Sequence, residues 1–199
     1  MNNAGKPPIR RLIDLYKLVL DLRGVERAMR IPGTEELEND VDHTYALAML
    51  AWFLAPHFPE LNRDTVIRIS LAHDLLEVHS GDTPVFGSRK HLDTKAEREA
   101  AALTQLAADW PDFPELHALL EDYEVRGSDE AKFVYALDKV APIIMGALNG
   151  GLDYRGQNVT KAASHASKSD KVALSPPVDE YYHELLDLLD AEYPEFFAK

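Results

Sequence analysis

Apolar side chains recur at helical spacing through almost every long segment of this chain, and this pattern constrains the fold more than any other feature. Near the amino terminus one apolar stripe is formed by Ile9, Leu12, Ile13, Tyr16, Val19 and Leu20. Residues three and four apart lie on the same face of an α-helix. No two segments show the alternating pattern that is typical of paired strands. The sequence therefore predicts an all-α fold.

The same periodicity, read with capping residues and with Pro and Gly, sets the expected element boundaries. We expect helices at about 9–22, 43–54, 64–81, 94–110, 114–125, 128–149 and 178–192. The polar stretches 26–42 and 151–177 are expected to be loops. The helix at 43–54 is apolar nearly all round, which predicts a buried central helix that holds Trp52 and Phe53 in the core.

Length and composition narrow the class of protein. A chain of 199 residues suits one domain with a full hydrophobic core, so we expect a single domain over residues 1–199. The absence of cysteine fits a reducing compartment, and a formal net charge of −13 argues against binding a nucleic-acid polymer. The segment 9–22 carries charges at helical intervals, which argues against a signal peptide or a membrane span. We expect a cytoplasmic protein without a membrane partner.

The residues that indicate chemistry are concentrated between Ile69 and Asp82. There His73 and Asp74 adjoin each other in an apolar run, where burial of an imidazole and a carboxylate is costly unless something binds them. On a continuous helix Glu77 would lie on the same side of the same turn. A divalent metal ion would turn the pair into ligands. The alternative is a helix end whose His and Asp are simply hydrogen-bonded.

Two more residues favour the metal. His43 lies at the start of the apolar central helix, and Asp138 lies inside another strongly apolar helix. Taken singly, His43 could be an ordinary residue of a first helical turn, and Asp138 could be the partner of Lys139 or Lys132. Together with the preceding pair they offer two imidazoles and two carboxylates. Such a mixed set predicts one divalent ion, with Mn, Co, Fe, Ni, Zn and Mg as candidates.

This ordered set resembles the signature of the HD-domain metal-dependent phosphohydrolases, which is a His, then His-Asp, then a distant Asp. Neighbouring runs look like the HD 5′-deoxynucleotidase branch, and these are residues 38–43, 73–78, 81–84 and 130–139. The resemblance covers a core at about 10–150. It implies an all-helical globule whose metal site lies between buried central helices and is held by His43, His73, Asp74 and Asp138.

The chemistry of phosphate ester hydrolysis assigns roles around this site. A bound divalent ion lowers the pKa of its water toward about 7 and polarises a phosphoryl oxygen. Glu77 is the candidate for orienting that water or relaying its proton, and Asp74 counts as catalytic through its place in the metal shell. Asp82 and Thr83 are candidates to contact the sugar. The alternatives are an exposed or orienting carboxylate for Glu77 and a turn-forming Asp82.

The resemblance further implies that an Arg before the central helix meets the substrate phosphate. Arg27 lies nearest that place, but the segment 27–33 carries a small insertion and lacks the aromatic neighbour of some relatives. Arg30 therefore stays an alternative, and a solvated surface Arg is the alternative for both. Relatives are often dimers, and the apolar helices are compatible with a homodimer.

Together these features predict a metal-dependent phosphohydrolase that releases phosphate from nucleoside 5′-monophosphates, and the resemblance implies deoxynucleotides. One alternative is another HD phosphohydrolase that acts on nucleoside triphosphates or cyclic nucleotides. A second alternative is a non-catalytic HD protein that senses a ligand.

Overall fold

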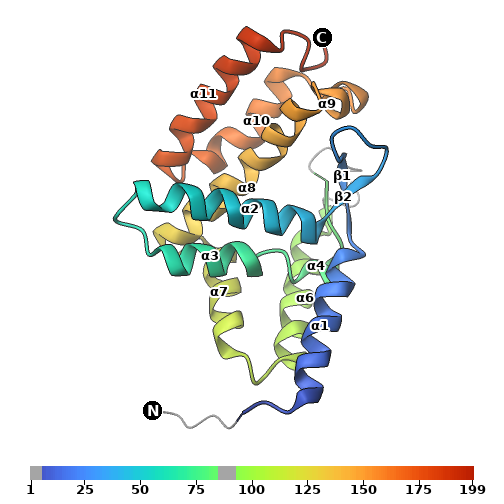
Figure 1. Ribbon diagram of the computed structural model, residues 1–199, viewed down its shortest axis with the longest axis vertical. Coiled ribbons are helices and arrows are strands. Elements are labelled where there is room, and N and C mark those ends of the chain that lie inside the picture. Colours follow the sequence, from blue (N-terminus) through green and yellow to red (C-terminus); the bar gives the residue numbers. More distant parts are fainter. Residues whose placement is uncertain (1–5, 85–92) are drawn as a thin grey trace.

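The computed structural model describes residues 6–84 and 93–199. The described chain is almost entirely helical and holds one two-stranded sheet (Figure 1). Its elements are α1 (Ile9–Arg23), β1 (Glu26–Arg30), β2 (Leu37–Asn39), α2 (Asp40–Leu54), η1 (Ala55–His57), α3 (Arg63–Ala72), α4 (Glu77–Ser80), α6 (Lys95–Asp109), α7 (Pro114–Val125), α8 (Asp129–Leu148), α9 (Leu152–Gly156), α10 (Lys161–Val172) and α11 (Pro176–Glu192). The predicted all-α class is confirmed.

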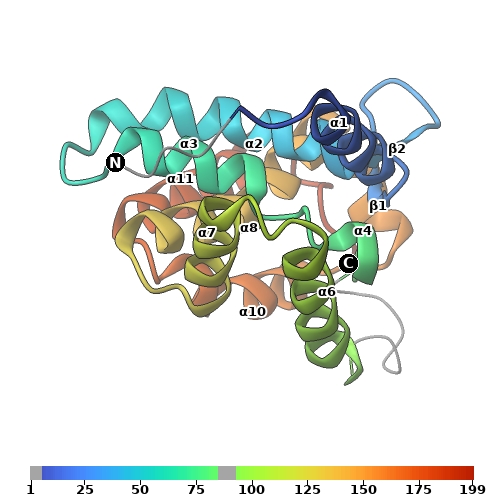
Figure 2. The same ribbon diagram turned by 90° about the horizontal axis from the view of Figure 1, so that it is seen from below.

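Helices α2, α3 and α8 pack against one another at the centre of the molecule, and α8 passes behind α2 in Figure 1. They share one hydrophobic core, which includes Leu47, Ala51, Val66, Ile69, Phe133 and Ile143. Helices α10 and α11 pack on α8, while α7 contacts both α3 and α8. Seen from below, α6 lies beside α7 (Figure 2). The central helices therefore share an interior in which side chains distant in sequence can meet.

The stretch 26–42 is not the loop that the sequence predicts. Strands β1 and β2 pair antiparallel, with Glu26 opposite Asn39 and Arg30 opposite Leu37. The turn between them uses Gly33 at a φ of +80°, which a residue with a side chain rarely adopts. Both strands are short and largely polar, so they lack the alternation by which strands are recognised.

The single helix predicted at 64–81 is also wrong, because α3 ends at Ala72 and α4 begins at Glu77. Between them the backbone tightens: the amide of Leu75 donates to the carbonyl of Ala72, and the amide of Glu77 donates to that of Asp74. Such three-residue spacing is typical of tight turns rather than of an α-helix. His73, Asp74 and Glu77 therefore do not lie on one regular helical turn.

The prediction of a loop at 151–177 is wrong as well, because α9 and α10 lie there. Helix α10 begins at a regular N-cap, where the hydroxyl of Thr160 accepts from the amide of Ala163. Its buried residues, Ser164, Lys168 and Val172, are spaced four apart and are mostly polar. A helix with a polar buried face carries no apolar stripe, so the periodicity could not reveal it.

Helix α2 is buried on one side only. Leu47 and Ala51 are fully buried, but Trp52 is 54% exposed and Phe53 is 73% exposed, so their predicted place in the core is wrong. Trp52 and Phe53 therefore lie on an outer face of α2.

No helix in the part of the chain that the structure describes is both long enough and apolar enough to cross a membrane.

Candidate metal centre and adjoining cavity

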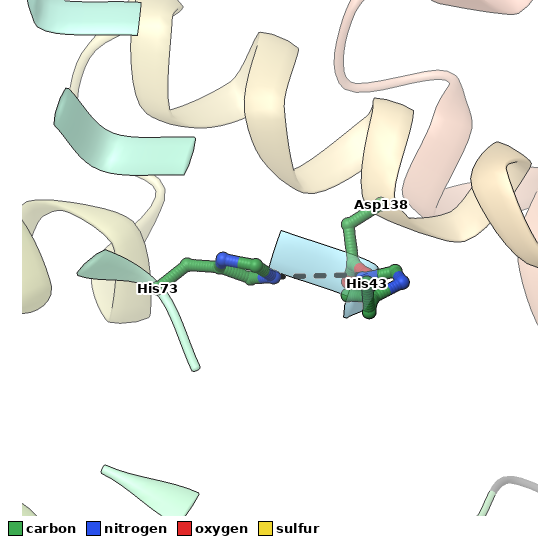
Figure 3. Close-up of side chains that lie close together, drawn as sticks. All are labelled: His43, His73 and Asp138. Carbon is green, nitrogen blue, oxygen red and sulfur yellow. Dashed lines mark hydrogen bonds and ion pairs between the residues drawn. The ribbon is translucent and has the colours of Figure 1, made fainter. Parts of the chain in front are cut away.

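Three buried side chains from different parts of the chain converge at the centre of the molecule. His43 comes from α2, His73 from the residue after α3, and Asp138 from the middle of α8 (Figure 3). One ligand atom from each lies within 4.8 Å of the other two. Nε2 of His43 is 2.9 Å from Oδ1 of Asp138, and Nε2 of His73 is 3.9 Å from the same oxygen. The structure therefore brings together three of the four predicted ligands in one cluster.

Local capping places His43 in this cluster. The side chain of Asn39 accepts hydrogen bonds from the amides of Val41 and Asp42, which fixes the first turn of α2. His43 follows in that turn and is 2% exposed. Burial lowers the pKa of His43, and the nearby guanidinium of Arg27 lowers it further. The neutral imidazole, which is the form that binds metals, is thereby favoured.

The ring of His73 is held in one orientation. Its Nδ1 donates to the carbonyl of Ser70 at 2.9 Å, which leaves Nε2 with a free lone pair. Nε2 is fully buried and lies 3.1 Å from Oδ2 of Asp74, without a well-aligned hydrogen bond to any residue in 6–84 or 93–199. A divalent ion could bind this nitrogen and the neighbouring carboxylate together, so the atom fits a metal ion.

Asp74 is the fourth predicted ligand, and it adjoins the cluster. Its Oδ2 lies 3.1 Å from Nε2 of His73 and 3.9 Å from Nε2 of His43. Burial by itself would raise the pKa of Asp74, but His73 and Arg27 lower that pKa more strongly. The carboxylate is therefore ionised and available as a ligand.

The carboxylate of Asp138 is fixed by two further donors. Nζ of Lys139 lies 2.5 Å from its Oδ2, and the hydroxyl of Tyr123 donates to the same oxygen at 3.3 Å. These bonds leave Oδ1 facing the two imidazoles. Lys139 is thus the partner of Asp138, as one sequence-based alternative proposed, and Asp138 belongs to the metal cluster at the same time.

The two candidate arginines occupy different places. Arg27 lines the cavity described below and pairs with three carboxylates, those of Glu38 at 3.3 Å, Asp40 at 3.0 Å and Asp74 at 3.1 Å. Arg30 pairs with Asp153 on α9 and is absent from the cavity lining in the described part of the chain. Only Arg27 is positioned next to the cluster.

A cavity of about 690 Å³ adjoins the cluster. The predicted site residues that line it are His73, Asp74, Glu77, Asp82, Thr83, Asp138 and Arg27. Burial, and then the neighbouring carboxylates Asp74 and Asp40, raises the pKa of Glu77 to about 11. A cation bound among these groups would offset their mutual repulsion.

Sequence reasoning missed most of the basic and aromatic residues of this lining, which are Tyr123, Arg126, Tyr135, Lys168 and Lys171. Lys139, which the sequence suggested only as a partner of Asp138, lines the cavity as well. Lys168 and Lys171 lie on α10, whose sequence carries no signal of burial.

A buried group of two imidazoles and carboxylates, with an unpartnered nitrogen and an adjoining cavity, has the composition of a divalent-metal site. The fold and this group define an α-helical metal-binding domain. The chain belongs to the HD domain family, whose model matches residues 19–177.

Known proteins similar to this chain agree with that assignment. The 5′-deoxynucleotidase HDDC2 of Mus musculus is 35% identical over 133 residues, which are 62% of this chain and 65% of that protein. The Homo sapiens protein of the same name is 31% identical over 150 residues, which are 73% of this chain and 72% of that protein. The matched part of the mouse relative is slightly less than two thirds of its length.

The fold also matches solved structures. A structure described as a predicted metal-dependent phosphohydrolase from Magnetospirillum magnetotacticum has a TM-score of 0.81 at 25% identity, and the match covers 96% of both chains. A conserved hypothetical protein from Pyrococcus furiosus has a TM-score of 0.64 at 24% identity and covers 90% of this chain and 99% of that one. The second likeness concerns the fold alone.

Proposed function

We propose that this protein is a metal-dependent phosphohydrolase that releases phosphate from nucleoside 5′-monophosphates, with deoxynucleotides as its substrates. The observation that carries the proposal is the convergence of His43, His73 and Asp138, all buried, within 4.8 Å of one another next to a cavity. Relatives named 5′-deoxynucleotidases support the substrate class. The volume of the cavity is in the range of small-molecule sites.

In this proposal one divalent ion is held by His43, His73, Asp74 and Asp138. When bound, such an ion would polarise a phosphoryl oxygen and lower the pKa of a water molecule, so that the resulting hydroxide can attack the phosphorus atom while the 5′-oxygen of the nucleoside leaves. The remaining work falls to the protein. Lys139 and Tyr123 hold the carboxylate of Asp138 in place, and Ser70 holds the ring of His73.

Glu77 is the proposed proton acceptor. It lines the cavity, and its Oε2 is buried without a hydrogen-bond partner in the described chain. A carboxylate in this place can orient the attacking water and take its proton. Burial and the neighbouring carboxylates raise the pKa of Glu77, and a bound cation would lower that pKa.

Substrate contacts complete the proposal. Arg27 pairs with Asp74 and lines the cavity, so it can orient the carboxylate of Asp74 and bind the substrate phosphate. Asp82 and Thr83 line the same cavity and are proposed to contact the sugar. Arg30 has no assigned role in the reaction, because it pairs with Asp153 and does not line the cavity in the described residues.

The partner, the compartment and the oligomeric state are also proposed. A net charge of −13 disfavours a nucleic-acid polymer, so the proposed partner is a small nucleotide. The proposed compartment is the cytoplasm, because a chain without cysteine fits a reducing compartment. The exposed apolar residues of α1 and α2, which include Tyr16, Trp52 and Phe53, are proposed to be covered in a homodimer.

Steady-state phosphate release tests the substrate class. The panel consists of paired dAMP and AMP, a nucleoside diphosphate, a triphosphate and a cyclic nucleotide, each with several divalent metals. The proposal expects dAMP to be hydrolysed faster than AMP, and both faster than the other compounds. Equal rates for dAMP and AMP would remove the deoxynucleotide preference, and activity confined to triphosphates or cyclic nucleotides would contradict the proposal.

A further inference from the structure

Three cationic side chains that line the cavity form no close ion pair with a carboxylate of the described residues. Lys168 and Lys171 come from α10, and Arg126 follows α7. None of them forms an ion pair with a carboxylate in residues 6–84 or 93–199. The remaining segments, 1–5 and 85–92, contain no Asp or Glu. We refer to Lys168, Lys171 and Arg126 as the cationic cluster.

The other cations around the cavity are already neutralised. Arg27 pairs with three carboxylates, Lys139 pairs with Asp138, and Lys95 lies 3.1 Å from Glu99. Each of these side chains has a structural partner that accounts for its charge. The cationic cluster differs because none of its members forms such an ion pair with a described residue, although Arg126 lies over the ring of Tyr135 and interacts with Glu124 of the same cavity.

Lys168 carries the strongest indication of a ligand. It is 6% exposed and lies between Ser164 and Val172 on the buried face of α10. A lysine residue is rarely buried to this extent unless its ammonium group is paired. Burial, followed by the nearby charge of Lys139, lowers the pKa of Lys168 to about 8. An anion in the cavity would supply the missing partner.

The cluster adjoins the metal centre. Both α10 lysines interact electrostatically with Asp138 and with Lys139, and Lys171 also interacts with Arg126. Helix α10 packs directly on α8, which carries Asp138. An anion held by the cluster would therefore lie close to an ion bound by His43, His73 and Asp138.

We propose that Lys168, together with Lys171 and Arg126, forms a phosphate-binding subsite that holds the phosphoryl group of the substrate beside the metal centre. The choice of phosphate rests on the proposed function. A phosphoryl group on a metal-bound substrate needs further positive charge, and the guanidinium of Arg27 is shared among Glu38, Asp40 and Asp74. The cluster provides that charge from an element outside the metal ligands.

Binding, measured without turnover, tests the subsite. Isothermal titration calorimetry of the metal-loaded protein would use two probes, inorganic phosphate and a 5′-methylenephosphonate analogue of deoxyadenosine monophosphate that cannot be hydrolysed. We expect Lys168→Met to weaken both ligands by about 10-fold or more, the scale of one charge-assisted hydrogen bond. Lys168→Arg should restore part of the affinity. Weakening for inorganic phosphate alone would assign the cluster to a free anion and overturn its role toward the substrate.

A matched control separates binding from folding. Lys161→Met changes a lysine of the same helix that pairs with Asp190 on the surface, and it should leave both affinities unchanged. Unchanged affinity in a folded Lys168→Met protein would overturn the proposal. If that variant fails to fold, reductive methylation of the wild-type protein replaces it, with the rate at Lys168 measured by mass spectrometry. Phosphate should slow that rate, and an unaffected rate would overturn the proposal.

The outcomes distinguish this inference from the proposed function. Phosphate binding that depends on Lys168, without hydrolysis of any nucleotide, would support the subsite and contradict the assigned reaction. Hydrolysis of dAMP with phosphate affinity independent of Lys168 would support the assigned reaction and overturn the subsite.

Discussion

Nε2 of His43 lies 2.9 Å from Oδ1 of Asp138, although 95 residues separate the two in sequence. The distance depends on the packing of α2 against α8 and on the bonds from Lys139 and Tyr123 that fix the other carboxylate oxygen. The hydrophobic core and these bonds therefore hold the side chains of the cluster in place. Such preorganisation reduces the ordering that accompanies binding.

Asp138→Asn should remove metal binding while leaving a folded protein. The amide is close in size, but it lacks the charge that a divalent ion requires. Loss of a residue that only orients a ligand typically weakens metal affinity by about 10–100-fold, so loss of a ligand should weaken it by about 100-fold or more. Competitive titration with a metal-binding dye measures the change. Asp153→Asn, which alters a buried carboxylate paired with Arg30, is the control. Equal effects of both substitutions would mean that Asp138 serves stability only.

Glu77→Gln should retain the metal and lose turnover. The substitution removes the proton acceptor but keeps the shape of the side chain, and general-base help is commonly about 10²–10⁴-fold. The expected result is a fall in kcat of about 100-fold or more, with metal content unchanged. Glu124→Gln changes another carboxylate of the same cavity and should leave kcat nearly constant. Wild-type turnover in Glu77→Gln at saturating metal would reduce Glu77 to a structural role.

Arg27→Met and Arg30→Met should have different consequences. Loss of Arg27 leaves Glu38, Asp40 and Asp74 without their shared cation, so stability should fall by about 3 kcal/mol and kcat/KM by about 10-fold or more. Loss of Arg30 leaves the buried Asp153 short of a partner, which should cost about 1 kcal/mol with kcat/KM retained. Chemical denaturation and steady-state kinetics measure the two effects. A larger kinetic defect in Arg30→Met would place the phosphate contact at Arg30.

Most helices could be predicted because the side chains that they bury are apolar. The boundaries of α7 agree with the expected 114–125, and those of α8, Asp129–Leu148, lie within one residue of the expected 128–149. The resemblance to the HD signature identified His43, His73 and Asp138, which the structure brings together. In these places the local signal and the tertiary structure have the same cause, which is a stripe of apolar residues that packs on the core.

The predictions that the structure contradicts were wrong for physical reasons. The turn at 73–76 is set by three-residue hydrogen bonds, which leave no mark on apolar spacing. Helix α10 buries Ser164 and Lys168, so its inner face looks like a solvent-exposed one in sequence. Trp52 and Phe53 are apolar yet exposed. The composition of a helix does not distinguish an apolar face that packs on the core from an apolar face at the surface.

The exposed face of α2 leads to a prediction about assembly. A double substitution, Trp52→Ser with Phe53→Ser, should convert the proposed homodimer to a monomer, because aromatic residues commonly dominate interface energies. Size-exclusion chromatography with light scattering reports the mass. Tyr181→Ser on α11 removes an exposed aromatic residue elsewhere and should leave the dimer intact. A wild-type protein that stays monomeric at high micromolar concentration would contradict the proposed homodimer.

One divalent ion at the His43, His73 and Asp138 cluster is proposed to make the protein a phosphohydrolase. The most direct test is to titrate metal-free protein with Mn²⁺ while following bound metal and phosphate release from dAMP in the same samples. We expect both signals to rise together and to saturate at about one equivalent, and the Asp138→Asn protein to show neither. Phosphate release that persists in metal-free protein, or that develops without metal bound at this cluster, would contradict it.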